Sequence, residues 1–120
     1  MKKLLLVSLV LGFMLIATHA DAGGDANAGQ EKSQVCSACH GADGNSPLPE
    51  FPILAGQHES YLVEALYQYR AAAKNEERTG KRSNAIMMGM AAGLSDEDIA
   101  DLAAYYAGQD GPLGKIPMPE

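Results

Sequence analysis

Cys36-Ser37-Ala38-Cys39-His40 is the stretch of sequence that decides the fold of this chain. Two thiols three positions apart on a helical turn can each add to one vinyl group of a haem, and the histidine that follows is placed to bind the iron. A redox dithiol has the same C-x-x-C spacing but belongs in a βαβ setting. A zinc site needs four ligands, and outside the N-terminal leader only His58 is left to join Cys36, Cys39 and His40. The motif therefore favours covalently attached haem c.

The second axial ligand determines what such an iron can do, because an open haem binds gases or peroxide and a six-coordinate haem mainly transfers electrons. Three methionines fall within four residues and outside any regular apolar stripe, which core packing explains poorly. We interpret His58, at the start of an expected helix, as a surface residue. The residues alone leave the choice open. The candidates are His58, Met87, Met88, Met90 and Met118.

The rest of the sequence predicts an all-α fold. Asp25 and Ser95 are natural N-caps, and no alternating β-branched run indicates a strand. Apolar residues recur at three and four spacing in two stripes, Tyr61 to Ala73 and Ile99 to Tyr106. Turn residues and three prolines make residues 41–57 an ordered loop or an unstructured one. About three main helices and long loops would therefore surround one haem. The helices are expected over about 26–36, about 58–73 and 95–107.

The N-terminus has the layout of a secretory signal peptide. Lys2 and Lys3 precede a 14-residue apolar run, and small residues at 20–22 form a cleavage site. The run is shorter than the roughly 20 residues that a spanning helix needs, so we expect cleavage, no stable membrane insertion afterwards and a periplasmic location. The expected segments are a signal peptide (1–22), a haem c domain (23–110) and a flexible C-terminal tail (111–120).

The composition is that of one small globular domain. The chain has 120 residues, is 47% hydrophobic and 20% charged, and carries a formal net charge of −6. Without the leader the charge becomes −7. An acidic chain argues against nucleic acid as a partner, and so small a core is often stabilised by a cofactor.

Six stretches, taken in order, resemble the class I cytochromes c of the bacterial c-553 type and one half of the dihaem c-4 type. This resemblance implies that Met87 is the axial ligand opposite His40, with Met90 as the alternative. It also implies that the carbonyl of Pro52 accepts the Nδ1 proton of His40. The stretches are CSACHGADGNSP (36–47), FPILAGQ (51–57), YL (61–62), MxGM (87–90), LSDED (94–98) and LAAYY (102–106).

The resemblance further implies that Gly29 lets the first helix cross the last one closely, near Leu102 and Tyr105. Some relatives place an aromatic residue on the first helix, where this chain has polar residues around Val35. That departure bears on the crossing and not on the haem site.

Five of the seven basic residues outside the leader fall between positions 70 and 82. They form a solvated loop, or one or two of them, Arg82 first, neutralise a haem propionate.

These features predict a monomeric electron carrier rather than an enzyme. It would exchange single electrons with redox proteins such as an oxidase, reductase or dehydrogenase, through a weak interface steered by charge. Two other functions stay open: the haem subunit of a periplasmic dehydrogenase, and a haem sensor or peroxidase with an open iron.

Overall fold

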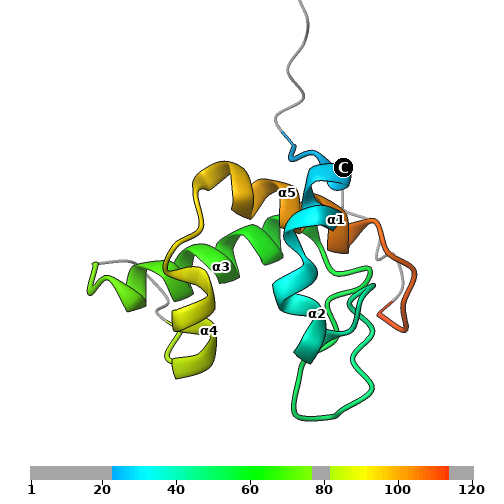
Figure 1. Cartoon of the computed structure of the whole chain (residues 1–120), viewed down its shortest axis with the longest axis horizontal. Helices are drawn as coiled ribbons and strands as arrows, with labels where there is room; N and C mark the ends of the chain where they lie inside the picture. The colour runs from blue at the N-terminus through cyan, green and yellow to red at the C-terminus, as the bar shows by residue number, and fades with distance from the viewer. Residues whose placement is uncertain (1–22, 77–81, 114–120) are drawn as a thin grey trace, which may run out of the picture.

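The computed structural model describes residues 23–76 and 82–113, and in this part of the chain all regular structure is helical. The predicted all-α fold is confirmed, while a short fourth segment that the sequence left unassigned is also a helix (Figure 1). The predicted leader (1–22) and most of the predicted tail (114–120) lie outside the described residues. The helices are α1 (Ala26–Lys32), α2 (Gln34–His40), α3 (Glu59–Ala73), α4 (Ala85–Ala91) and α5 (Asp96–Ala107).

The first helical segment extends further than predicted and is interrupted. The expected end near Cys36 is wrong, because helical structure continues to His40 after a break at Ser33. The Ser33 hydroxyl donates to the carbonyl of Gln30 at 2.8 Å, a local bond that competes with the helical ladder and bends helices. Gly41, with a φ of 81°, then ends α2. The whole C-x-x-C-H motif is therefore helical, and His40 is its last helical residue.

The predicted close crossing of the first and last helices is confirmed. A Cβ atom added at Gly29 would collide with the backbone carbonyl of Asp101 and with the Tyr105 side chain. Lys32 continues the contact, since its ammonium lies 2.6 Å from the Asp101 carboxylate and 2.9 Å from that of Asp98. The other Asp101 oxygen accepts from the backbone N–H of Asp25 at 2.7 Å. Both ends of α1 are thus attached to α5.

The long loop after α2 is ordered, one of the two outcomes that the sequence allowed. Backbone N–H groups of Leu54 and Ala55 donate to the carbonyl of Gly44, and the N–H of Gly56 donates to the carbonyl of Tyr106 at 3.0 Å. Gly44 has a φ of 82°, and a Cβ there would press on the Tyr106 ring. The loop is therefore held against the C-terminal part of α5.

The core joins α3 to α5 and leaves two helices apart. Its buried cluster consists of one leucine of α3 and four residues of α5. The α4 helix packs on α3 and α2 packs on α1, but α2 and α4 make no contact with each other. They face one another across a gap (Figure 1). The cluster residues are Leu62, Leu102, Ala103, Tyr105 and Tyr106.

Candidate functional site

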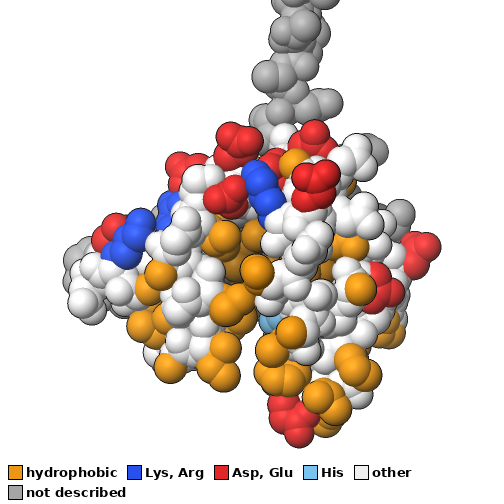
Figure 2. Space-filling model, viewed as in Figure 1, with side chains coloured by type: hydrophobic (Ala, Val, Ile, Leu, Met, Phe, Trp, Pro, Cys, Tyr) orange, Lys and Arg blue, Asp and Glu red, His pale blue; other side chains and the backbone are white. Residues whose placement is uncertain are grey.

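An apolar cavity with a volume of about 240 Å³ occupies the space between these helices. Figure 2 shows a hollow between α4 and α2 with hydrophobic side chains on its walls, and acidic side chains gathered at the far end of the molecule, over α1 and α5. Large apolar cavities with a few polar groups are the usual sites for cofactors. Six of the seven residues that the sequence assigned to the site line the cavity, and Cys39 is the exception. The six are Cys36, His40, Pro52, Arg82, Met87 and Met90.

His40 is buried, with 5% of its surface exposed, and its ring is held by the loop. Its Nδ1 lies 2.9 Å from the backbone oxygen of Pro52, and the Phe51 ring packs edge-on with centroids 6.3 Å apart. A carbonyl oxygen only accepts hydrogen bonds, so Nδ1 carries the proton. In the neutral ring the remaining nitrogen, Nε2, then carries no proton, which is the form in which imidazole binds iron.

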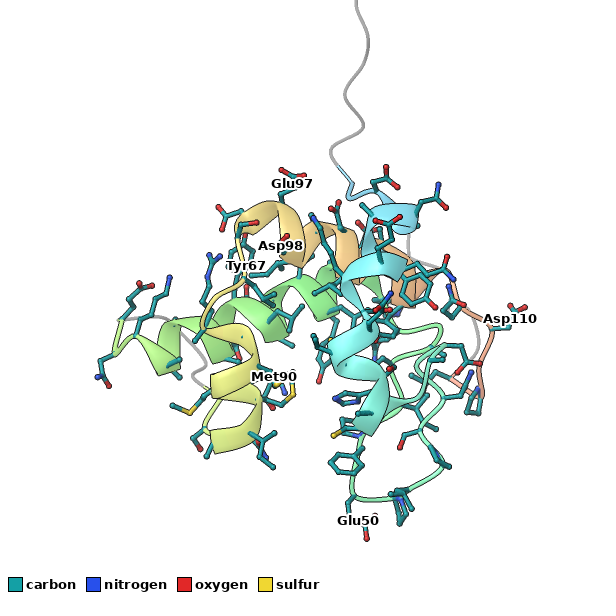
Figure 3. All side chains as sticks on the ribbon, viewed as in Figure 1. Glu50, Tyr67, Met90, Glu97, Asp98 and Asp110 are labelled. Atoms are coloured by element: carbon teal, nitrogen blue, oxygen red, sulfur yellow. The ribbon has the colours of Figure 1, made fainter. Side chains whose placement is uncertain are left out.

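The α4 helix brings two methionines to the cavity. Met87 and Met90 stand three positions apart and so share a helix face, and both line the cavity, whereas Met88 does not. Asn84 caps the helix, because its side chain accepts from the Met87 N–H at 3.0 Å. Met90 is 40% exposed and lies between α4 and α2 (Figure 3); Met87 is more enclosed.

Arg82 is positioned by aromatic side chains of α3. Its Nη2 donates to the Tyr61 hydroxyl at 2.9 Å, and its guanidinium lies over the rings of Tyr61 and Tyr69, 5.2 and 5.7 Å from their centroids. Its Nε is buried and has no hydrogen-bond partner. A buried N–H of a cation without a partner is rare, and it indicates an anionic or polar group that binds in the cavity.

Of the other candidates, those that the structure describes do not line the cavity. His58 precedes α3 and does not line the cavity, and Met118 lies outside the described residues. Arg70 donates to the carbonyl of Leu94 at 2.8 Å and to Asp96 at 2.6 Å, which is a structural role. Arg78 and Lys81 fall in the segment that the structure does not describe.

Sequence reasoning placed the tyrosines of this site only on apolar helix stripes. Tyr61, Tyr69 and Tyr106 line the cavity. Their hydroxyl groups add polar positions that an apolar stripe does not indicate. The sequence signal that could have found these hydroxyl groups is a stripe of tyrosines on one helix face followed by an arginine nearby in the chain.

The other metal and redox chemistries find little support. Within the described ranges no three His, Cys, Asp or Glu side chains gather to hold a metal ion, so a four-ligand zinc site is not formed there. The same ranges contain no strand for a βαβ dithiol setting. Burial raises the pKa of the Cys36 thiol, which makes it a weaker redox nucleophile.

The residues present fit a haem. A buried imidazole with an unprotonated nitrogen, a thioether sulfur from a facing helix and a cation with an unpartnered N–H surround one apolar cavity. A helical chain that arranges these groups around a C-x-x-C-H motif is a class I cytochrome c.

Comparison with known proteins agrees with that class. The profile of the family "Cytochrome c" matches residues 26–108, and the chain belongs to this family. Cytochrome c4 of Pseudomonas aeruginosa is 50% identical over 110 residues, covering 92% of this chain and 50% of the relative. Cytochrome c-554(548) of Halomonas halodenitrificans is 48% identical over 87 residues, covering 72% of this chain and 99% of the relative.

A solved structure resembles the fold. The crystal structure of reduced recombinant cytochrome c4 from Pseudomonas stutzeri superposes with a TM-score of 0.67 at 49% identity, covering 73% of this chain and 47% of that one. The chain thus spans about half the length of the cytochrome c4 relatives that it matches. Haem c is the cofactor of the family, and Cys36 and Cys39 fit its attachment motif.

Proposed function

We propose that this chain is a carrier of single electrons, with one haem c joined to Cys36 and Cys39 and its iron between His40 and Met87. When bound, the haem supplies a one-electron couple between ferric and ferrous iron. The chain does not itself catalyse a reaction, because two filled axial positions leave no site for a substrate on the iron.

The observation that carries the proposal is the hydrogen bond between His40 Nδ1 and the Pro52 carbonyl. It fixes the tautomer that leaves Nε2 free, and it keeps the ring from rotating. The ring is buried at the cavity wall. A histidine kept in this state has the properties of a permanent ligand rather than of a proton shuttle.

Met87 is the better candidate for the second ligand. It is more enclosed than Met90, and its N–H is fixed by the Asn84 cap, so its backbone is defined. Met90 lies one turn further on, towards the solvent, and covers the edge of the cavity. A sulfur ligand also favours the ferrous state and so a relatively high potential.

Arg82 is proposed as the partner of a haem propionate. Arg82 lines the cavity, and its buried Nε has no hydrogen-bond partner. Stacking on two rings holds the planar guanidinium in place, so little conformational freedom is lost when a carboxylate binds.

Electron exchange is proposed to occur at the cavity mouth, between redox proteins and a largely apolar surface. Val35, Ile86 and Met90 are exposed hydrophobic residues on or beside the helices that face each other there. On the face shown in Figure 2, acidic side chains gather at the opposite end of the molecule, over α1 and α5. They orient an approaching basic partner at long range, while the apolar surface makes a weak contact. We propose that the chain works as a monomer.

The proposed location is the periplasm, where the predicted leader (1–22) would deliver the chain. Among the described residues, no helix has the length and apolar character to cross a membrane.

Replacement of the methionines tests the ligand assignment. The ferric holoprotein should show the weak far-red charge-transfer band of a sulfur-iron bond. We expect Met87→Ala to abolish this band, lower the potential and open the ferrous iron to carbon monoxide. The matched control, Met90→Ala, should keep the band. A band that survives Met87→Ala and disappears with Met90→Ala would assign the ligand to Met90, and carbon monoxide binding to the unmodified protein would favour a sensor or peroxidase.

A further inference from the structure

The hydroxyl group of Tyr106 is a buried polar group without a partner. The residue is 3% exposed and lines the cavity, and its Oη makes no hydrogen bond. The adjacent Tyr105 is also buried, yet its hydroxyl donates to the carbonyl of Ala42 at 2.9 Å. Buried hydroxyl groups nearly always have a partner. An exception on a cavity wall indicates that the partner belongs to the loaded site.

The polar groups nearest to this hydroxyl limit which group can be its hydrogen-bond partner. Cys36 packs against the core cluster that contains Tyr106, and its thiol lies beside the hydroxyl. Ser33 is the other neighbour; its hydroxyl donates to the carbonyl of Gln30 at 2.8 Å, and no hydrogen bond joins it to the Tyr106 hydroxyl. Burial raises the pKa of the Tyr106 phenol, so the group remains a donor at neutral pH and requires an acceptor.

We propose that the Tyr106 hydroxyl donates a hydrogen bond to the sulfur of Cys36 when that sulfur is a haem thioether. A thioether has lost the S–H proton and retains its lone pairs, so it acts only as an acceptor. The propionate groups of a haem lie at the edge remote from its vinyl groups, and Cys36 fixes a vinyl edge next to Tyr106. A propionate therefore does not reach this hydroxyl. The inference rests on the covalent attachment in the proposed function.

Such a bond gives Tyr106 a positioning role. It restrains the Cys36 side chain from the α5 side, while α2 restrains it through the backbone. It also withdraws electron density from the sulfur, and hydrogen bonds to the groups that hold a haem tune its potential. The hydroxyl should therefore raise the reduction potential slightly. The stretching frequency of the carbon-sulfur bond of Cys36 should also change when the O–H proton of Tyr106 is exchanged for deuterium.

Resonance Raman spectra of the holoprotein in H₂O and D₂O test this directly. We expect the carbon-sulfur stretching mode of the Cys36 thioether to shift in D₂O, because the Tyr106 O–H exchanges. Tyr106→Phe keeps the ring and removes only the hydroxyl, so it should abolish the shift and lower the midpoint potential. The matched control is Tyr105→Phe, which loses the bond to Ala42 and should keep both the shift and the potential.

Failure of the proposed hydrogen bond can be distinguished from failure of the proposed function. If the carbon-sulfur mode of the unmodified holoprotein does not shift in D₂O, or if Tyr106→Phe retains the shift and the potential, the proposed hydrogen bond is wrong. If the denatured protein has the mass of the polypeptide without haem, covalent attachment fails, and the proposed function fails with it. The isotope comparison on the unmodified protein does not depend on how well the variant folds.

Discussion

At the scale of single residues, the site is built from polar groups that have one defined state before any partner binds. His40 has its proton on Nδ1 because its neighbour is a carbonyl oxygen, and Arg82 has its plane fixed by two tyrosine rings. Groups held in this way lose little freedom when a cofactor binds, so more of the binding free energy is retained. The same fixed positions make the charge around the cofactor well defined.

The Arg82 proposal leads to a prediction about pH. In Arg82→Gln the cation next to the propionate is lost, so the propionate pKa should rise by roughly one to three units. The midpoint potential should fall, since a positive charge near the iron favours the ferrous form. Its pH dependence should move to higher pH in the variant. Redox titrations at a series of pH values measure both effects.

Arg70→Gln is the matched control for Arg82→Gln. It removes another arginine, but one that binds Leu94 and Asp96 and does not line the cavity. It should reduce stability and leave the pH dependence of the potential unchanged. Equal effects of the two variants on the potential would contradict a direct role for Arg82.

At the scale of elements, the crossing of α1 and α5 fixes the position of the haem-attachment helix. The α2 helix follows α1 after one residue and packs on it. Any displacement of α1 on α5 therefore moves Cys36 and His40. This crossing depends on a missing side chain at Gly29 and on ion pairs of Lys32.

Gly29→Ala should destabilise the holoprotein by about 1–3 kcal/mol, the usual effect of forcing extra atoms into a close contact. The added Cβ would meet the Asp101 carbonyl, which belongs to helical backbone and cannot rotate away. For a domain of this size the melting temperature falls by roughly 4–8 °C per kcal/mol. Thermal denaturation followed by circular dichroism measures the shift.

The matched control for Gly29→Ala is Gly93→Ala. Gly93 is exposed and a Cβ there meets no atom within 4 Å, so the change should leave stability the same or raise it by up to about 1 kcal/mol. A melting temperature of Gly29→Ala equal to that of the control would show that the crossing tolerates a wider separation.

The ion pairs at the crossing predict a dependence on acid. The backbone N–H of Ser95, followed by the Lys32 ammonium, lowers the pKa of Asp98 to about 2, and Lys32 also lowers the pKa of Asp101. Because these pKa values are depressed in the folded state, their stabilisation is present above the ordinary value near 4 and is lost as the pH falls towards 2. Lys32→Met should therefore be less stable than the parent at pH 7, and the difference should shrink between pH 4 and pH 2.

Urea denaturation of both proteins across this pH range measures the difference. A difference in the free energy of unfolding that stays constant down to pH 2 would contradict the assignment of these ion pairs.

The same contacts raise the pKa of Lys32. The contribution of Lys32 to the free energy of unfolding should therefore disappear only above about pH 10.5, the ordinary pKa of lysine.

The sequence predicted the long helices better than the short elements, and six of the seven residues that it assigned to the site line the cavity. The helices α3 and α5 have apolar stripes, and α5 has a capping box, which are strong local signals. The α4 helix has seven residues, a glycine in its interior and an apolar character all round, so no periodicity marks it. The break at Ser33 depends on one side-chain hydrogen bond, and the Arg82 stacking depends on contacts distant in sequence.

At the scale of the whole molecule, the described part consists of two groups of helices that meet mainly through α3 and α5. One group carries His40 and Cys36 and the other carries Met87, and α2 and α4 do not contact each other. The buried residues are few, and four of the nine apolar ones are alanines; Ile99 is the one large side chain in the described ranges that is fully buried. The surface with most potential to add stability is therefore the cavity wall itself.

This arrangement predicts that folding depends on haem attachment. Without haem, the apolar cavity wall would face solvent, and α4 and α2 would lose the group that joins them. A cofactor that binds only the folded chain stabilises it by mass action, and two thioether bonds add a constraint on the unfolded chain. We therefore expect Cys36→Ala combined with Cys39→Ala to give a haem-free chain that is largely unfolded or degraded. The single variant Cys39→Ala, which can keep one thioether bond, is the matched control and should be intermediate. Circular dichroism and thermal denaturation of the purified proteins measure this, and a cooperative transition of the haem-free double variant close to that of the holoprotein would show that the helices fold without their cofactor.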